Sequence, residues 1–263
     1  MTNSDKGDDG VGASGSNGAS GRKVPGREPS MKPLPRRFYK AATCGPDGDG
    51  FAVLLDGRAA RTPGKQKLAV ASRVLAEALA EEWGAQGTSI NPATMPLSRI
   101  VIVALDGVAG NERAVAGVII AYGGSDLVCY RASSPPGLVE LQATHWDPVI
   151  AWAAGRLGAR FKVAEGIVHV TQDADALDRL RGQLDGRDAI RLAALHVMTT
   201  LTGSALIALA HADEFFGVEA AWQAAHVDED WQKRQWGEDE EAAERRERRW
   251  RDMQAASRIL TLA

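Results

Sequence analysis

The sequence contains little cysteine. Among its 263 residues only Cys44 and Cys129 are cysteines, and they are far apart, without the C-x-x-C spacing of zinc and redox sites. Two isolated cysteines provide neither a disulfide framework nor a structural zinc site. We therefore predict that the protein works in a reducing compartment and needs no metal or other cofactor.

An excess of charge of one sign is also missing. The chain has 31 Lys and Arg against 34 Asp and Glu, with a formal net charge of -3 and a pI near 6.0. Such a chain has no overall basic field to attract nucleic acid, so DNA or RNA is not favoured as a partner.

Long hydrophobic runs are represented by one candidate only, Ala193 to Ala212, which carries no Asp, Glu, Lys or Arg. Its length would nearly span the hydrocarbon core of a bilayer, which is about 30 Å thick. However, His196, Ser204 and three threonines make the run only moderately apolar. We predict a buried central helix and no membrane insertion.

Motifs of the common enzyme classes are lacking. The glycines between Gly45 and Gly50 are not followed by a helix or by GKS or GKT, and Gly123 to Asp126 lacks the spacing of a nucleophile elbow. None of the histidines pairs with another at metal-ligand spacing on a helix face: His145, His169, His196, His211 and His226. The prediction is that the protein is not an enzyme.

Two alternatives stay open at this point. One is a small-molecule hydrolase that uses Asp126 and Asp147 with a histidine. The other is an RNA-binding module that uses the arginines of residues 245–251, although Glu244 and Glu247 alternate with them and favour pairs within one helix.

Residues 1–34 have almost no large apolar side chains and are rich in Gly, Ser and Asp. Ordering them would cost conformational entropy that no burial offsets, so we predict a disordered tail. The first residues, MTNSDKGDDG, carry acids and lack the apolar core of a secretory signal, which predicts a bacterial cytoplasmic location.

The remaining chain predicts an α+β fold in two parts. Residues 35–131 are predicted to form a small β-rich domain with helices, and residues 132–263 a mainly α-helical domain. The apolar runs at 38–43 and 51–55 flank a turn and predict a hairpin. The expected helices are residues 72–86, 111–122, 173–184 and 187–216, with a new helix starting at Asp147-Pro148; residues 99–105 fit a strand or a helix, and 127–131 and 161–170 fit strands.

The stretch from Val218 to Leu260 is the most distinctive part of the chain. On one continuous helix, the following residues share a face that begins apolar and turns polar: Val218, Trp222, Ala225, Glu229, Gln232 and Trp236. Gly237 is predicted to end this helix, and residues 238–260 to form a second one with acids first and arginines later. Such a terminal hairpin is either a solvated charged surface or a binding surface.

Several segments in order along the chain carry a resemblance to a known family: GFAVLLDGR, RTPGK, LAEEWGAQG, NPATMPLSR, YGGSDLVCYRA, WDPVIAW and DEDWQKRQWGEDEEA. Together they resemble the assembly chaperones of the F-type ATP synthase that bind the alpha subunit of the catalytic head. The similarity runs from about Phe38 to Leu260.

The resemblance implies a β-rich N-terminal part, a helical C-terminal part and a non-enzymatic role. The expected partner is unassembled alpha subunit, which the protein, as a monomer, would keep from aggregating until the beta subunit arrives; eukaryotic relatives act in the mitochondrial matrix. The family motif implies that Glu229 and Glu240 matter for activity. With the helix face, this gives four predicted client-binding residues: Glu229, Gln232, Trp236 and Glu240.

Overall fold

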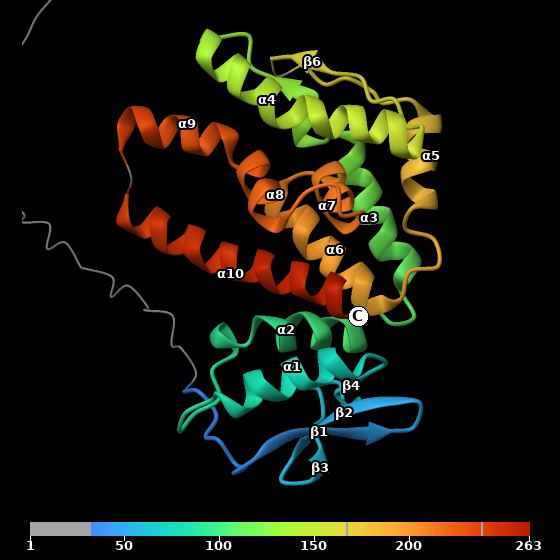
Figure 1. The fold of residues 1–263 in the computed structure, drawn as a ribbon, viewed down its shortest axis with the longest axis vertical. Coiled ribbons are helices and arrows are strands. Elements are labelled where there is room, and N and C mark those ends of the chain that lie inside the picture. Colours follow the sequence, from blue (N-terminus) through green and yellow to red (C-terminus); the bar gives the residue numbers. More distant parts are fainter. Residues whose placement is uncertain (1–32, 167, 238) are drawn as a thin grey trace, which may run out of the picture. The chain divides into compact units, whose positions relative to one another are not determined.

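A computed structural model describes residues 33–166, 168–237 and 239–263, and residues 34–263 form one compact unit. A small antiparallel sheet is followed by a long succession of helices (Figure 1), which confirms the predicted α+β class. The predicted disordered tail, residues 1–34, lies almost wholly outside the described residues. The predicted division between residues 131 and 132 stays a prediction.

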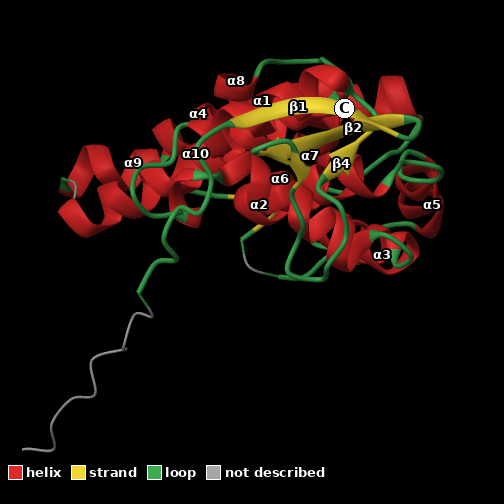
Figure 2. Ribbon diagram, turned by 90° about the horizontal axis from the view of Figure 1, so that it is seen from below, coloured by secondary structure: helices red, strands yellow, loops and turns green. Residues whose placement is uncertain are grey.

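The sheet comes from the first part of the described chain and consists of β1 (Ala42–Asp47), β2 (Gly50–Leu55), β3 (Arg58–Ala59) and β4 (Ala69–Val70). Its strands are yellow in Figure 2. β1 and β2 form the predicted antiparallel hairpin, and β3 and β4 pair with the other edge of β2. Gly48 in the hairpin turn has a φ of 59° and Gly57 in the next turn has a φ of 79°. Both turns therefore need the left-handed backbone that glycine adopts without strain.

The helices follow in the order α1 (Arg73–Gly84), α2 (Pro96–Val103), α3 (Glu112–Gly124), α4 (Pro136–Trp152), α5 (Ala174–Gly182), α6 (Ala189–Thr202), α7 (Ala205–Ala212), α8 (Val218–Ala225), α9 (Val227–Trp236) and α10 (Glu240–Leu262). Shorter elements lie between them: the 3-10 turns η1 (Pro92–Thr94) and η3 (Leu127–Cys129), the π turns η2 (Ala104–Val108) and η4 (Ala153–Leu157), and the parallel strand pair β5 (Tyr130–Arg131) and β6 (Ala164–Glu165).

The ambiguous segment at residues 99–105 is helical, and a side chain of α1 explains why. The carboxylate of Glu82 accepts hydrogen bonds from the backbone N–H groups of Leu97 and Ser98, both at 2.8 Å. N–H groups in the first turn of a helix have no partner inside the helix, so a carboxylate there stabilises the start of α2. The contact between Glu82 and the start of α2 thus favours the helix, where periodicity alone fitted both a strand and a helix.

The apolar run at 193–212 is buried at the centre of the unit, as predicted. Leu195, Met198, Leu206 and Ile207 are fully buried. The predicted continuous helix is, however, two helices, because Gly203 has a φ of 68° and the side chain of Ser204 caps the N-terminus of α7. Within the described residues, no helix is long and apolar enough to cross a membrane.

Asp126 ties the end of α3 to this central pair. Its side chain is completely buried, and its carboxylate accepts hydrogen bonds from the backbone N–H of Val128 at 3.3 Å and of Leu206 at 3.0 Å. The carboxylate therefore caps η3 and the first turn of α7 together. Because η3 forms at Leu127, only Tyr130 and Arg131 of the predicted strand pair as β structure.

The prediction of a new helix at Asp147-Pro148 is wrong, because α4 continues through Pro148. An interior proline costs a helix about 3 kcal/mol or more. Trp146, Val149 and Trp152 are buried on either side of it, and the indole N–H of Trp146 donates a hydrogen bond of 2.6 Å to the carbonyl of Ala224. Burying each of these side chains is worth about 1.5–3 kcal/mol, which outweighs the proline. Likewise, among the described residues of the predicted strand at 161–170, only Ala164 and Glu165 are β structure.

We expect the Asp126 carboxyl to titrate with a pKa of about 6, because its burial raises that pKa from the ordinary value of 3.8. Between these two pH values the folded chain holds a proton that the unfolded chain has lost. The contribution of Asp126 to the free energy of unfolding is therefore largest at low pH and falls as the pH rises through about 6.

Carbon-13 NMR of the aspartate carboxyl groups measures this titration. Asp56 is an internal control of the opposite sign, since hydrogen bonds from the backbone of Ala41 and Lys40 lower the pKa of its carboxyl. An Asp126 midpoint below that of ordinary aspartates would show that its hydrogen bonds outweigh desolvation.

Candidate functional site

The predicted helix from Val218 to Trp236 is broken at His226, so its single face does not exist. His226 has φ −118° and ψ 20°, which ends α8 and begins α9. Its ring stacks on Trp222 with centroids 3.8 Å apart, and its Nδ1 is hydrogen-bonded to the carbonyl of Trp222 at 2.8 Å. The Trp222 carbonyl therefore pairs with the imidazole of His226, while the backbone N–H of His226 donates to the carbonyl of Gln223.

The break separates the two halves of the predicted face. Trp222, on α8, is buried against Trp250 of α10, with ring centroids 5.2 Å apart. Glu229, Gln232 and Trp236, on α9, are exposed. The apolar half is therefore core, and only the polar half with its terminal tryptophan is available to a partner.

α9 is held on α4 by a polar and an apolar contact. The side-chain amide of Gln142 donates a hydrogen bond of 2.7 Å to the Asp228 carboxylate. Trp231 covers Gly137, where an added Cβ would lie only 2.8 Å from the indole. The absence of a side chain at Gly137 is what lets α9 approach α4 so closely.

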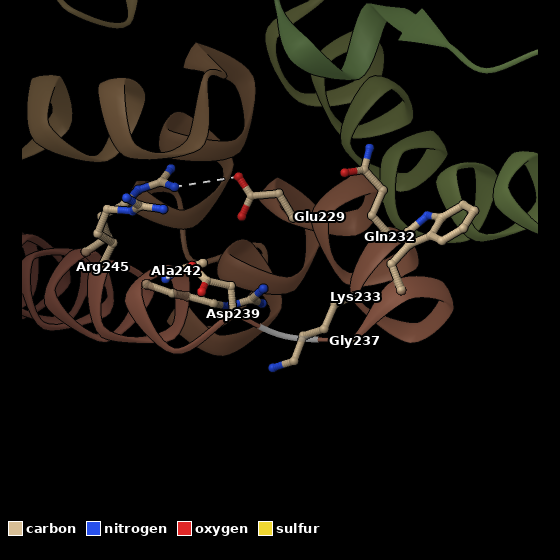
Figure 3. Close-up of a pocket in the computed structure, with 10 residues that line it drawn as sticks. Glu229, Gln232, Lys233, Gly237, Asp239, Ala242 and Arg245 are labelled. Carbon is tan, nitrogen blue, oxygen red and sulfur yellow. Dashed lines mark hydrogen bonds and ion pairs between the residues drawn. The ribbon is translucent and has the colours of Figure 1, made fainter.

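α9 and α10 enclose a groove of about 400 Å³ (Figure 3). α9 contributes Glu229, Gln232, Lys233 and Trp236, and the α10 side contributes Asp239, Ala242, Arg245, Arg246 and Arg249. Three of the four predicted client-binding residues therefore line one groove. Glu240 is exposed in the first turn of α10 and is not among the residues that line it.

Arginines of α10 bridge the groove to α9. Arg246 lies 2.5 Å from the carboxylate of Asp230, with both side chains largely covered. Arg249 lies 3.6 Å from the carboxylate of Glu229 and donates a hydrogen bond of 2.7 Å to the carbonyl of Leu201 on α6. The Glu229 side chain remains 56% exposed, so its pairing is the looser of the two.

The roles of Arg246 and Arg249 were missed from the sequence, although a signal was present. The other arginines of residues 245–251 make the expected pairs within α10: Arg245 with Glu241, Arg248 with Glu244 and Arg251 with Glu247. Arg246 and Arg249 have no acid three or four residues before them. Their guanidinium groups are left to reach across to another helix.

His226 is a buried neutral group next to Glu229, one of the residues that line the groove. Burial lowers the pKa of its imidazole, and the nearby Arg246 and Arg249 lower it further, against the raising effects of the Trp222 carbonyl and Glu229. Its Nε2 lies 3.8 Å from the Glu229 carboxylate. The positive charge of the groove therefore comes from Lys233 and the arginines, and not from His226.

The exposed end of α9 carries Trp236, whose exposed fraction is 86%. Gly237 follows with a φ of 90°, which confirms the predicted end of this helix. A tryptophan without cover beside a groove of mixed charge is an arrangement typical of binding surfaces, where tryptophan and arginine are enriched.

The residues of the hydrolase alternative do not form an accessible site. Asp126 is completely buried, while Asp147 is exposed and pairs with Arg131 at 2.8 Å. Burial raises the pKa of the Cys129 thiol to about 12, so it stays protonated and unreactive at neutral pH. In the part of the chain that the structure describes, no cluster of His, Cys, Asp and Glu side chains could hold a metal ion.

We expect Gly137→Leu to displace Trp231 and loosen α9, because the new side chain would occupy the space of the indole. Hydrogen exchange followed by mass spectrometry should show at least about tenfold faster exchange in α9 and little change in α6. Gly84→Leu is the matched control, since a Cβ at Gly84 meets nothing within 4 Å. Unchanged exchange in α9 would mean that Trp231 does not anchor it.

Comparisons of the sequence and of the structure with known proteins point to the same family. The family model described as ATP12 chaperone protein matches residues 36–154. The Atu1473 protein from Agrobacterium tumefaciens is 49% identical with a TM-score of 0.84, and the match covers 88% of this chain and 87% of that chain. Atp12 from Paracoccus denitrificans is 40% identical with a TM-score of 0.81, covering 87% and 98%. A mutant of P. denitrificans Atp12p is 39% identical with the same TM-score of 0.81, covering 87% and 97%.

These identities extend over nearly the whole of each chain, and they confirm the resemblance to the ATP synthase assembly chaperones. The chain belongs to the ATP12 chaperone family.

Proposed function

We propose that this chaperone binds the unassembled alpha subunit of the F-type ATP synthase, and that the groove between α9 and α10 is where it does so. Family membership supports a chaperone role in ATP synthase assembly. The choice of the alpha subunit and of this groove is the proposal. It acts in the cytoplasm as a monomer, without a cofactor and without catalysing a reaction.

The observation that carries the proposal is the exposed Trp236 beside the loosely paired Glu229. Trp236 offers a large apolar surface that burial against a partner would stabilise. The carboxylate of Glu229 is more than half exposed and 3.6 Å from Arg249, so it can exchange this partner for a donor on the client at little cost.

Contacts through Trp236 and Glu229 suit a chaperone that must later release its client. An exposed pair contributes about 1 kcal/mol or less, and a single aromatic side chain adds a few kcal/mol at most. The beta subunit, which offers the alpha subunit a larger interface, would then displace the chaperone by mass action without an energy source.

Size-exclusion chromatography of the full chain, mixed separately with purified alpha and beta subunits and no nucleotide, tests the client. We expect co-elution with alpha and not with beta. If both subunits eluted without the chaperone, the proposal would fail.

We expect Glu229→Lys to keep the fold and to weaken binding of the alpha subunit by about tenfold or more, because it places a third cation beside Arg246 and Arg249 and removes the more exposed of the two α9 carboxylates that pair with them. Binding is measured by titration calorimetry and folding by thermal unfolding. Glu247→Lys is the matched control, since its side chain is 59% exposed, close to the 56% of Glu229, and lies on α10 outside the groove.

Equal losses of affinity in both variants would point to net charge instead of a contact at Glu229. A Glu229→Lys chain that does not fold would make Glu229 a structural residue.

We expect Trp236→Ala to leave the unfolding temperature within about 1–2 °C of the unchanged chain, because an exposed side chain contributes little to stability. The same variant should bind the alpha subunit at least about tenfold more weakly. Unaltered affinity would exclude Trp236 from the interface.

A further inference from the structure

A second pocket, of about 470 Å³, lies among α2, the π turn η2, α3 and α6. Its lining is largely aliphatic and includes Ile100, Val103, Val108, Val115 and Val197. Val103 at its edge is 58% exposed, although it is a large apolar side chain. The pocket therefore presents uncovered apolar surface to water, which is a feature of protein interaction sites.

The π turn η2 shapes one wall of this pocket. π turns insert an extra residue into a helix and occur frequently at functional sites. Gly107 belongs to η2 and lines the pocket, and a Cβ at this position would meet nothing within 4 Å. A larger side chain at position 107 would therefore have open space to occupy.

The polar side chains of the pocket offer no unpaired charge that would bind a charged group. Arg99 and Asp252 form an ion pair with each other at its edge. His196 has no hydrogen-bond partner among the described residues, and its burial lowers the pKa of the imidazole, which is neutral at pH 7. The pocket thus suits an uncharged aliphatic or aromatic group.

The pocket and the α9–α10 groove both border α10, and both lie against α6. Asp252 of the pocket is three residues after Arg249 of the groove, about 4.5 Å further along α10 at a rise of about 1.5 Å per residue. On α6, Val197 of the pocket is one turn before Leu201, whose carbonyl accepts the hydrogen bond from Arg249. The two sites are therefore neighbours along α10 and α6.

We propose that this pocket receives an apolar side chain of the alpha subunit, next to the part of that subunit which occupies the α9–α10 groove. The inference rests on the proposed function, because the occupant is the same client. A subunit that has not yet met its partner still exposes the apolar centre of its interface. An aliphatic pocket that borders the same helix as the charged groove would cover part of that area.

Gly107→Leu tests the pocket by filling it from its own wall. We expect the Kd for the alpha subunit to rise by about tenfold or more, the loss expected when one buried aliphatic side chain is excluded. Gly155→Leu is the matched control: Gly155 belongs to the other π turn, η4, and a Cβ there also meets nothing within 4 Å. Its Kd should match that of the unchanged chain.

Photo-crosslinking gives a second measurement that leaves η2 intact. A benzoylphenylalanine at Val103 should form an adduct with the alpha subunit on irradiation. The same residue at Val74, which is 56% exposed on α1, should not.

The outcomes separate the two proposals. If Glu229→Lys weakens binding while Gly107→Leu binds normally and Val103 gives no adduct, the pocket is not part of the interface and the proposed function stands. If the unchanged chain does not bind the alpha subunit, both proposals are overturned. Equal losses in Gly107→Leu and Gly155→Leu, without an adduct at Val103, would also overturn the pocket.

Discussion

The buried carboxylate of Asp126 is the constraint on which the helical part of this fold depends. It caps the short turn η3 and the first turn of α7 at once, so it fixes the end of α3 against the break between α6 and α7. That break directs the chain toward α8 and then α9. Desolvation opposes the charged carboxylate, while its hydrogen bonds favour it, and the raised pKa shows that desolvation prevails. Asp126 therefore has a structural role, although a raised carboxyl pKa is also a feature of catalytic groups.

The groove between α9 and α10 has two kinds of contact: those that pack α9 on α4, and ion pairs on the side that faces the groove. Trp231 over Gly137 and the hydrogen bond from Gln142 to Asp228 fix α9 on α4. The contacts on the groove side are ion pairs. The pair between Arg246 and Asp230 is largely covered, whereas the pair between Arg249 and Glu229 is longer and more exposed, so Glu229 can exchange its partner more easily. A chaperone that must release its client needs a binding surface whose own contacts are weak while its scaffold stays in place.

Much of the fold could be predicted because local signals agreed with the tertiary structure. The hairpin followed from apolar runs around glycine turns, α1 from its apolar spacing, and the end of α9 from Gly237. Predictions went wrong where a distant side chain outweighed the local preference. Burial of Trp146 and Val149 carried α4 through Pro148, and the stacking of His226 on Trp222 ended α8 where periodicity continued. Arg246 and Arg249 could have been recognised by their lack of an acid on the preceding turn.

The sequence by itself determined the class of fold, the family, the central buried helices and three of the residues that line the groove, because these depend on composition, spacing and ordered motifs that one reads along the chain. The tertiary structure alone decided that Trp222 is core while Trp236 is exposed, that Asp126 is inaccessible, and that Glu240 lies outside the groove. These outcomes depend on which helices meet. A side chain's periodicity gives its direction from its own helix, whereas its burial depends on what another part of the chain places opposite to it.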